Sequence, residues 1–276
     1  MPTTVFIEFD SPAPVEATPR RLHAAWGRVL DLPEGVSPER ARSLPALAPR
    51  PPHALGGPKP YCVGQTTASG RTYGFELRFL DDRLVDTLDG WLIWGGVLPV
   101  GDGGRGTVAL AARSAQVVEH RTWAELEAQD TDTSWVVRLL TPTVFSSRGR
   151  HVPGVSPASL AASLHARWCA YSPTGPLRLP DRRALAEALT TVDRTEPVEV
   201  GLAMPRGDGR GRLSANRIVA YKGELRISAR PGATAQVLSR LMALACFTNA
   251  GSHTAYGMGV VDVEAGAQSG GDAITS

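Results

Sequence analysis

The sequence is short of cysteine, and it contains no long apolar run. The three cysteines, Cys62, Cys169 and Cys246, lie far apart without a Cys-x-x-Cys spacing. We therefore expect buried thiols in a reducing compartment, and neither disulfides nor a zinc site. No segment approaches the roughly 18 consecutive apolar residues of a membrane span, and the first residues lack the pattern of a signal peptide. The sequence thus predicts a cytoplasmic protein that has no membrane partner.

A marked excess of charge of either sign is also absent. The chain has 29 lysines and arginines against 27 aspartates and glutamates, which gives a formal net charge of +2 at pH 7. Only Lys59 and Lys222 are lysines, so arginine carries nearly all of the positive charge. A genome whose base composition favours arginine, alanine, glycine and proline codons explains this bias, and guanidinium groups suit phosphates whatever its cause. The near-neutral balance excludes no class of partner, because a basic groove can lie on a neutral protein.

The order of expected elements indicates an α+β fold. With 276 residues, 42% of them hydrophobic, the chain is long enough for two domains. Alternating apolar residues predict strands, Thr18 followed by Pro19 predicts the start of a helix, and residues 31–59 form a Pro-rich connection. We expect strands at residues 3–9, 60–67, 71–80, 107–120, 134–145, 197–204, 213–228 and 257–264, and helices at residues 18–30, 82–93, 156–171, 181–192 and 234–247.

The second half of this order is β-α-β-β-α-β with one inserted helix, and the first half follows it less clearly. We therefore predict two tandem ferredoxin-like (RRM-like, βαββαβ) domains. The N-terminal domain comprises residues 1–130 and the C-terminal domain comprises residues 131–264. Residues 265–276 are rich in glycine and serine and are expected to be a disordered tail.

Three stretches of the sequence carry a family resemblance. Residues 249–260 are similar to the C-terminal glycine-rich loop of the RAMP proteins, in which five residues separate two Gly-x-Gly units. Asn249 stands at the first glycine, and asparagine tolerates a left-handed backbone next best. Residues 136–143 and the Leu-rich helix after them resemble the start of the C-terminal domain of the CRISPR-associated repeat-specific endoribonucleases. His53 and Lys59 resemble the place at which several of those enzymes carry a catalytic histidine and a nearby lysine.

The resemblance to this family of pre-crRNA-processing enzymes of the RAMP superfamily implies an activity. The implied reaction is metal-independent cleavage within each CRISPR repeat of the precursor RNA, which yields crRNAs. Attack by the 2′-hydroxyl would leave a 2′,3′-cyclic phosphate and a 5′-hydroxyl, and no cofactor would be needed. The implied partners are the repeat RNA, subunits of a CRISPR interference complex and a second copy of the chain.

Histidines are the candidates for acid–base chemistry. RNA carries its own nucleophile, so a metal-free enzyme needs a base, an acid and positive charge beside the phosphorane. His53 lies in a Pro-rich loop without apolar periodicity, and we predict that it is catalytic, with Lys59 on the same segment supplying the charge. His23 flanks the apolar face of the first helix and completes an acid–base pair with His53. A solvated loop histidine at position 53 and an interfacial histidine at position 23 are the alternatives.

Arginines and glycines of the second half are the candidates for RNA binding. Several arginines crowd a Gly-rich hairpin, where guanidinium groups match phosphate geometry, although a solvated turn is an equal interpretation. The sequence shows no ladder of aromatic residues of the kind that binds single strands. Asp81 and Asp82 near a turn favour capping rather than a metal site. The predicted RNA-binding residues are Arg148, Arg150, Arg206, Arg210, Arg212, Arg217, Gly251, His253, Gly257 and Gly259.

Two other functions are compatible with these patterns. A non-catalytic RNA-binding RAMP subunit of an interference complex would share the fold and the glycine-rich loop. It would differ from a nuclease in whether the region around His53 forms a competent site. An unrelated ferredoxin-like binding protein would have no affinity for RNA.

Overall fold

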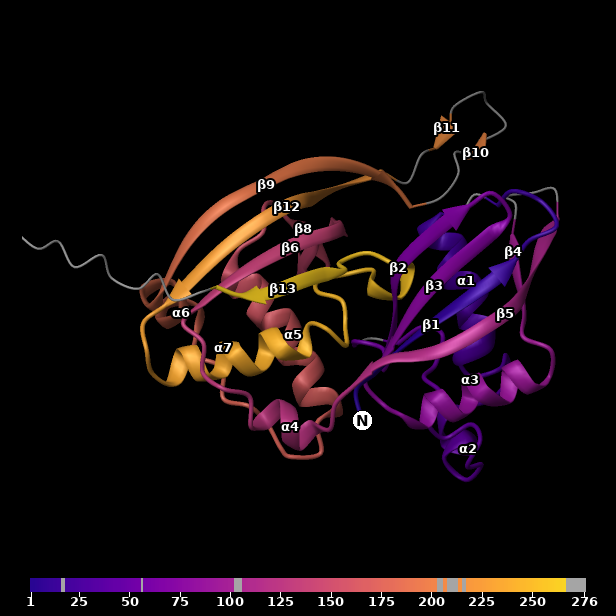
Figure 1. Ribbon diagram of the computed structural model, residues 1–276, viewed down its shortest axis with the longest axis horizontal. Coiled ribbons are helices and arrows are strands. Elements are labelled where there is room, and N and C mark those ends of the chain that lie inside the picture. Colours follow the sequence, from indigo (N-terminus) through magenta and orange to yellow (C-terminus); the bar gives the residue numbers. More distant parts are fainter. Residues whose placement is uncertain are drawn as a thin grey trace, which may run out of the picture.

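The computed structural model describes residues 1–15, 18–55, 57–101, 106–202, 206–207, 213–214 and 217–266. In this part of the chain, two larger antiparallel sheets lie side by side, each with helices packed on one face (Figure 1). None of the described helices is both long and apolar enough to cross a membrane. The α+β class predicted from the order of elements is confirmed.

The N-terminal sheet has the strand order β2-β3-β1-β5-β4. Residues Val5, Ile7 and Phe9 of β1 alternate toward the core and are buried, as the sequence predicts. Trp26 of α1 packs edge-on against Phe9, because the apolar residues of the helix recur at helical spacing. The elements are β1 (Thr3–Asp10), α1 (Pro19–Leu30), α2 (Pro38–Arg42), β2 (Tyr61–Ser69), β3 (Thr72–Phe79), α3 (Arg83–Ile93), β4 (Val97–Gly101) and β5 (Thr107–His120).

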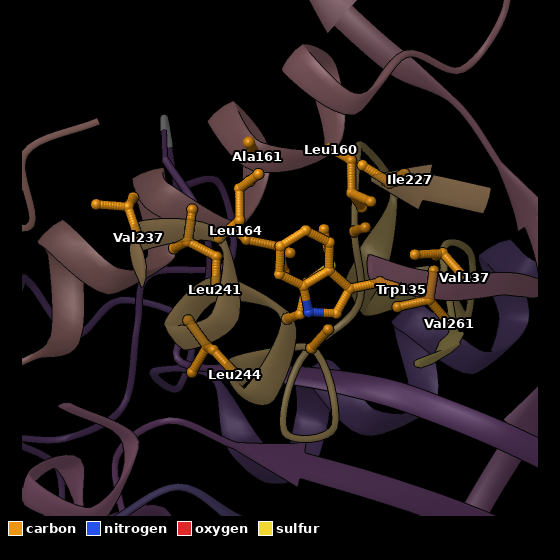
Figure 2. Packing of buried hydrophobic residues seen from close by; sticks show 14 of the residues in the cluster. Trp135, Val137, Leu160, Ala161, Leu164, Ile227, Val237, Leu241, Leu244 and Val261 are labelled. Atoms are coloured by element: carbon orange, nitrogen blue, oxygen red, sulfur yellow. The ribbon is translucent and has the colours of Figure 1, made fainter. Parts of the chain in front are cut away.

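The C-terminal sheet has the strand order β13-β6-β12-β9. Figure 2 shows Trp135 of β6 enclosed between Leu160 and Leu164 of α5 and Leu241 of α7. Burial of these large side chains holds both helices on one face of the sheet. The elements are α4 (Trp123–Glu127), β6 (Ser134–Thr143), β7 (Phe145–Ser147), β8 (Arg150–Val152), α5 (Pro157–Tyr171), α6 (Arg182–Ala188), β9 (Leu189–Gly201), β10 (Arg206–Gly207), β11 (Leu213–Ser214), β12 (Arg217–Ala229), α7 (Ala233–Leu244), the 3-10 helix η1 (Thr254–Tyr256) and β13 (Val261–Ala265).

The structure corrects two expected elements. The helix expected at 181–192 ends at Ala188, and β9 begins at Leu189. The β-branched run from Thr190 to Val192 favours a strand, and it pairs with β12. The last strand begins at Val261 rather than at residue 257, because the residues before it form η1 and two glycines with positive φ.

The expectation that all three cysteines are buried is wrong for Cys169. Cys62 is buried and Cys246 is half-buried, but Cys169 is exposed on α5. Helix α5 buries Leu164 and Trp168, and Cys169 lies one position beyond this apolar stripe. A single step along a helix turns a side chain by about 100°, which is enough to move it to solvent.

Direct hydrogen bonds join the two halves of the chain. The buried Arg78 of β3 donates from Nη1 to the carbonyl oxygens of Ala245 and Thr248, at 3.2 and 3.3 Å. The side-chain amide of Asn249 donates to the carbonyl oxygen of Val63 in β2 at 2.7 Å. The segment that follows α7 therefore packs on the N-terminal sheet, which brings the glycine-rich loop next to α1.

Candidate active site

A cavity of about 910 Å³ lies between the two halves of the chain. His23 of α1 and His53 and Lys59 of the segment before β2 line its N-terminal side. One face of α5 and residues 251–256 of the glycine-rich loop line its C-terminal side. The structure therefore brings the three predicted catalytic side chains together and places them opposite the glycine-rich loop.

A buried carboxylate, Asp31, organises the N-terminal side of the cavity. Asp31 is the C-cap residue of α1, and its side chain is 1% exposed. Its Oδ2 accepts hydrogen bonds from Lys59 Nζ at 2.6 Å and from His53 Nδ1 at 2.8 Å, and its Oδ1 accepts one from the Tyr61 hydroxyl at 2.8 Å. An ionised carboxylate can only accept, so we assign a hydrogen to Nδ1 of His53. Nε2 of His53 is then the nitrogen available for chemistry.

The Lys59–Asp31 pair is removed from solvent, whereas the His53 side chain is 61% exposed. Burial lowers the pKa of Lys59, and the hydrogen bond and charge of Asp31 oppose that change. Burial also raises the pKa of Tyr61 well above its ordinary value, and Asp31 adds to this effect. Tyr61 is therefore a neutral donor that supports a buried ion pair, and His53 is the member of the network that a substrate can reach.

His23 is the second imidazole of the site. Its ring centroid lies 4.8 Å from that of His53. Burial, together with the positive charges of Lys59 and His53, lowers the pKa of His23 to about 4, while Asp31 opposes them. His23 is therefore neutral near pH 7 and has a lone pair that can accept a proton.

The backbone of the glycine-rich loop depends on its glycines at two positions. A Cβ on Gly251 would lie 2.3 Å from the carbonyl oxygen of Val144, and a Cβ on Gly259 would lie 1.8 Å from that of Ala250. Both glycines have positive φ, at 85° and 76°. His253 also has a left-handed backbone, with φ of 59°. A side chain is thus held in a costly conformation at the cavity wall, which is typical of functional sites.

Asn249 does not have the role expected for it. The residue stands where the family pattern has a glycine, and we expected it to tolerate a left-handed backbone. Its φ is not positive; instead its buried amide donates to the carbonyl oxygens of Val63 at 2.7 Å and Met258 at 2.9 Å. Asn249 therefore ties the two ends of the loop to β2 through its side chain, and its backbone amide adds a hydrogen bond to Cys62 Sγ of β2 at 3.2 Å.

Aromatic rings from four separate segments form a row along the cavity. His53 lies next to His23, and His23 stacks on Tyr256 with centroids 4.2 Å apart and ring planes 12° apart. Tyr256 packs edge-on against His253 at 5.3 Å, and His253 against His151 of β8 at 5.7 Å. The sequence showed no aromatic ladder because these residues are far apart along the chain.

Helix α5 holds the glycine-rich loop. The buried Arg167 donates from Nη2 to the carbonyl oxygen of Gly251 at 3.1 Å and to the hydroxyl of Thr254 at 3.2 Å. The Ser163 hydroxyl accepts from the Gly251 amide at 2.7 Å and from Arg167 Nη1 at 2.8 Å. At the end of the same helix, the Tyr171 hydroxyl donates to the carbonyl oxygen of Pro58, next to Lys59. One helix therefore fixes both walls of the cavity.

The predicted RNA-binding arginines are scattered. Arg148 and Arg150 are exposed at the β7–β8 turn, and Arg217 on β12 pairs with Glu199 at 3.1 Å. The backbone of Arg206 lies in β10, and Arg210 and Arg212 lie outside the described residues. Gly251 and His253 line the cavity, whereas Gly257 and Gly259 shape the loop behind it.

The site also has the donor types of a metal centre. His23, Asp31 and His53 offer ligand atoms that all lie within 4.8 Å of one another. The Lys59 ammonium already occupies Asp31 Oδ2 at 2.6 Å. The present arrangement favours an acid–base site over a metal site.

Sequence reasoning missed four residues of this site: Asp31, Tyr61, Arg167 and Tyr256. Asp31 could have been noticed as an acidic residue at a helix C-terminus, where the helix dipole disfavours negative charge. Tyr61 is the first residue of β2 and follows Lys59 by only two positions, so its nearness to the predicted catalytic lysine was visible in the sequence. No local pattern marks Arg167 or Tyr256, because their partners come from other elements.

Comparison with known proteins supports the family resemblance. Residues 137–261 match the sequence model of the CRISPR-associated endoribonuclease Cas6. No curated protein matches the chain.

Solved Cas6 structures share the fold along nearly the whole chain. A Cas6 product complex has a TM-score of 0.70 at 24% identity, over 96% of this chain and 100% of that chain. Thermus thermophilus Cas6 has a TM-score of 0.62 at 23% identity, over 96% and 98% of the two chains. Another Cas6 product complex has a TM-score of 0.66 at 20% identity, over 96% and 100%. The chain is thus similar to the Cas6 endoribonucleases in sequence over residues 137–261 and in fold over nearly its whole length, in agreement with the resemblance in its sequence.

Proposed function

We propose that this protein is a metal-independent endoribonuclease that binds CRISPR repeat RNA and cuts the precursor transcript within each repeat. The observation that carries the proposal is the pair of imidazoles, His23 and His53, 4.8 Å apart in a cavity opposite the glycine-rich loop. Two imidazoles at this separation can flank a single phosphate. One can then act as the base and the other as the acid.

The different surroundings of the two imidazoles support different roles for them. His23, held neutral by burial, accepts the proton of the 2′-hydroxyl as its oxygen attacks the adjacent phosphorus. His53, held by Asp31 through Nδ1, delivers a proton from Nε2 to the leaving 5′-oxygen as the P–O5′ bond breaks. The products are a 2′,3′-cyclic phosphate and a 5′-hydroxyl, and the site has gained no net proton. Enzymes commonly use different surroundings to shift the pKa values of two titratable groups apart, so that one group acts as the acid and the other as the base.

Lys59 supplies positive charge to the phosphorane. Its ammonium has three hydrogens, of which two point to Asp31 and Tyr61, and the residue lines the cavity. The third hydrogen is available to a phosphate oxygen. Asp31 holds the ammonium and the His53 ring in fixed positions, so little reorganisation is needed when charge develops.

The RNA-binding surface extends from this centre across the C-terminal half. We infer that Gly251 and His253 at the cavity wall, and Arg148 and Arg150 at the β7–β8 turn, contact the repeat. The underlying frame is two tandem ferredoxin-like domains, residues 1–130 and 131–264. The observed strand orders, β5-β1-β3-β2 and β13-β6-β12-β9 within the two sheets, support this reading. Arg206, Arg210, Arg212 and Arg217 remain predicted RNA contacts, of which Arg210 and Arg212 lie outside the described residues.

The test is cleavage of a labelled repeat RNA in EDTA, with a second substrate that carries a 2′-deoxy sugar at the cut. We expect cleavage at one position, no cleavage of the deoxy substrate, and a cyclic phosphate on the product. His53→Ala and His23→Ala should each lower the single-turnover rate by about 10²–10⁴-fold while RNA binding persists. His120→Ala, at an exposed strand end outside the cavity lining, is the matched control and should keep the wild-type rate.

Other outcomes of this test would contradict the proposal in distinct ways. Tight binding without cleavage by the wild-type protein would favour a passive RNA-binding subunit of an interference complex. Cleavage that EDTA abolishes and Mn²⁺ restores would assign His23, Asp31 and His53 to a metal centre. Absence of binding would contradict both RNA-related functions.

A further inference from the structure

Tyr256 has no assigned role, yet it makes the closest ring contact of the site. It lies in η1 of the glycine-rich loop, and its ring covers His23 at 4.2 Å with the two planes 12° apart. His23 belongs to α1 in the N-terminal half, so the contact crosses between the halves. His53 is the other ring that contacts His23, and the planes of these two rings are tilted by 51° relative to each other. Of these two contacts, only the one with Tyr256 is a parallel stack.

Several hydrogen bonds fix the loop that carries Tyr256. Arg167 of α5 bonds the carbonyl oxygen of Gly251 and the hydroxyl of Thr254, two residues before Tyr256. The side-chain amide of Asn249 donates to the carbonyl oxygens of Thr254 at 3.4 Å and Met258 at 2.9 Å, one on each side of Tyr256. The Tyr256 amide itself donates to the carbonyl oxygen of His253 at 2.9 Å. The backbone that carries the ring is therefore held by a buried network.

We propose that Tyr256 is a positioning residue for His23. By stacking on the imidazole from the N-terminal half, the ring of Tyr256 in the glycine-rich loop fixes the orientation of that imidazole. A stacked ring restricts rotation of the imidazole about χ2 and keeps water from one of its faces. The nitrogen that faces the cavity is then directed at the attacking hydroxyl. The proposal rests on the proposed nuclease function for its kinetic test, and its structural test is independent of activity.

The proposal separates a role of the ring from a role of the hydroxyl. Tyr256→Phe keeps the ring and loses the oxygen, whereas Tyr256→Leu keeps the apolar volume and loses the stack. Misplacement of a catalytic group by about 1 Å can cost on the order of 100-fold in rate. We expect Tyr256→Leu to lower the single-turnover cleavage rate by at least about tenfold, and Tyr256→Phe to restore most of the rate. The dissociation constant of the 2′-deoxy repeat should change by less than about twofold in both variants.

The independent measurement is the pH titration of the His23 ring by NMR in the free protein. Burial lowers the pKa of His23 to about 4, and the ring of Tyr256 is one of the groups that bury it. Loss of the ring admits water, so the midpoint should move upward toward the ordinary value in Tyr256→Leu and stay in place in Tyr256→Phe. The acid limb of the cleavage profile should move upward with it.

Three results would overturn the proposal. An unchanged His23 midpoint in Tyr256→Leu would show that the ring does not seat the imidazole, whatever the protein does to RNA. Equal losses of rate in the Phe and Leu variants would assign the role to the hydroxyl. A loss of affinity for the 2′-deoxy repeat with no change at His23 would make Tyr256 an RNA contact. If the wild-type protein cleaves no repeat RNA, the proposed function fails while the NMR result still decides the role of Tyr256.

Discussion

The two halves of the molecule have similarly ordered four-strand cores but contribute to the cavity in different ways. The N-terminal half supplies titratable side chains, His23, His53 and Lys59, arranged around the carboxylate of Asp31. The C-terminal half supplies a shaped backbone, whose glycines approach other carbonyl groups too closely for any side chain. The first contribution depends on the chemical identity of residues and the second on their conformation. Substitutions in the two regions should therefore impair the protein for different reasons.

The largest expected effect on stability is in the polar network of the N-terminal half. Asp31→Ala would leave the Lys59 ammonium buried without its partner, and breaking a buried ion pair from one side costs about 3–5 kcal/mol. Urea denaturation measures the change in the free energy of unfolding. Asp31→Ala combined with Lys59→Met should recover much of the loss, since the unpaired charge is then absent. A cost below 1 kcal/mol for Asp31→Ala would mean that solvent reaches the pair.

The next largest effect on stability is expected at a backbone position in the C-terminal half. Gly259→Ala places a Cβ 1.8 Å from the carbonyl oxygen of Ala250, at a residue with φ of 76°. We expect a loss of more than about 1 kcal/mol by thermal or urea denaturation, because both the contact and the backbone are unfavourable.

The matched control for that glycine is Gly90 in α3, where a Cβ meets no atom within 4 Å. Gly90→Ala should stabilise the protein by about 0.5–1 kcal/mol, because alanine loses less backbone entropy in a helix. If both variants changed stability equally, the glycine-rich loop would not be under the steric constraint described above.

A smaller effect is expected on the pH dependence of stability, and it comes from His23 in the N-terminal half. The pKa of His23 is about 4 in the folded protein and near 6.5 when the chain is unfolded. Between these values the unfolded chain binds more protons, so the contribution of His23 to stability is complete above about pH 6.5 and is lost as the pH falls toward 4. His23→Gln should therefore flatten the dependence of the free energy of unfolding on pH in this window. Identical slopes for wild type and variant would contradict the buried, neutral state of His23.

The smallest effect is expected for an ion pair outside the cavity lining. Arg217 and Glu199 lie 3.1 Å apart on neighbouring strands, and their side chains are 63% and 68% exposed. Glu199→Ala should change the free energy of unfolding by less than about 1 kcal/mol, in contrast to Asp31→Ala. Because Arg217 belongs to the proposed RNA surface, Glu199→Ala should also strengthen RNA binding at low salt, as measured by a filter-binding titration.

Local patterns in the sequence were sufficient for much of the fold. The alternation in β1 and the Thr18-Pro19 start of α1 have direct counterparts in the structure. The boundary between α6 and β9 was misplaced because the helix and the strand are contiguous, with no glycine or proline to mark the change. The pairing of β9 with β12 decides that boundary, and sheet partners are not visible in a local window.

For the candidate site, the sequence by itself determined the identity of the titratable groups. His53 and Lys59 lie in one short segment, and His23 lies beside the apolar stripe of α1; these local patterns, together with the family resemblance, nominated all three. Only the tertiary structure decided what surrounds them. The carboxylate of Asp31, the ring of Tyr256 and the guanidinium of Arg167 reach the cavity from separate elements. Proton affinity and ring orientation depend on distance and burial in space, and packing of the two halves against each other sets both.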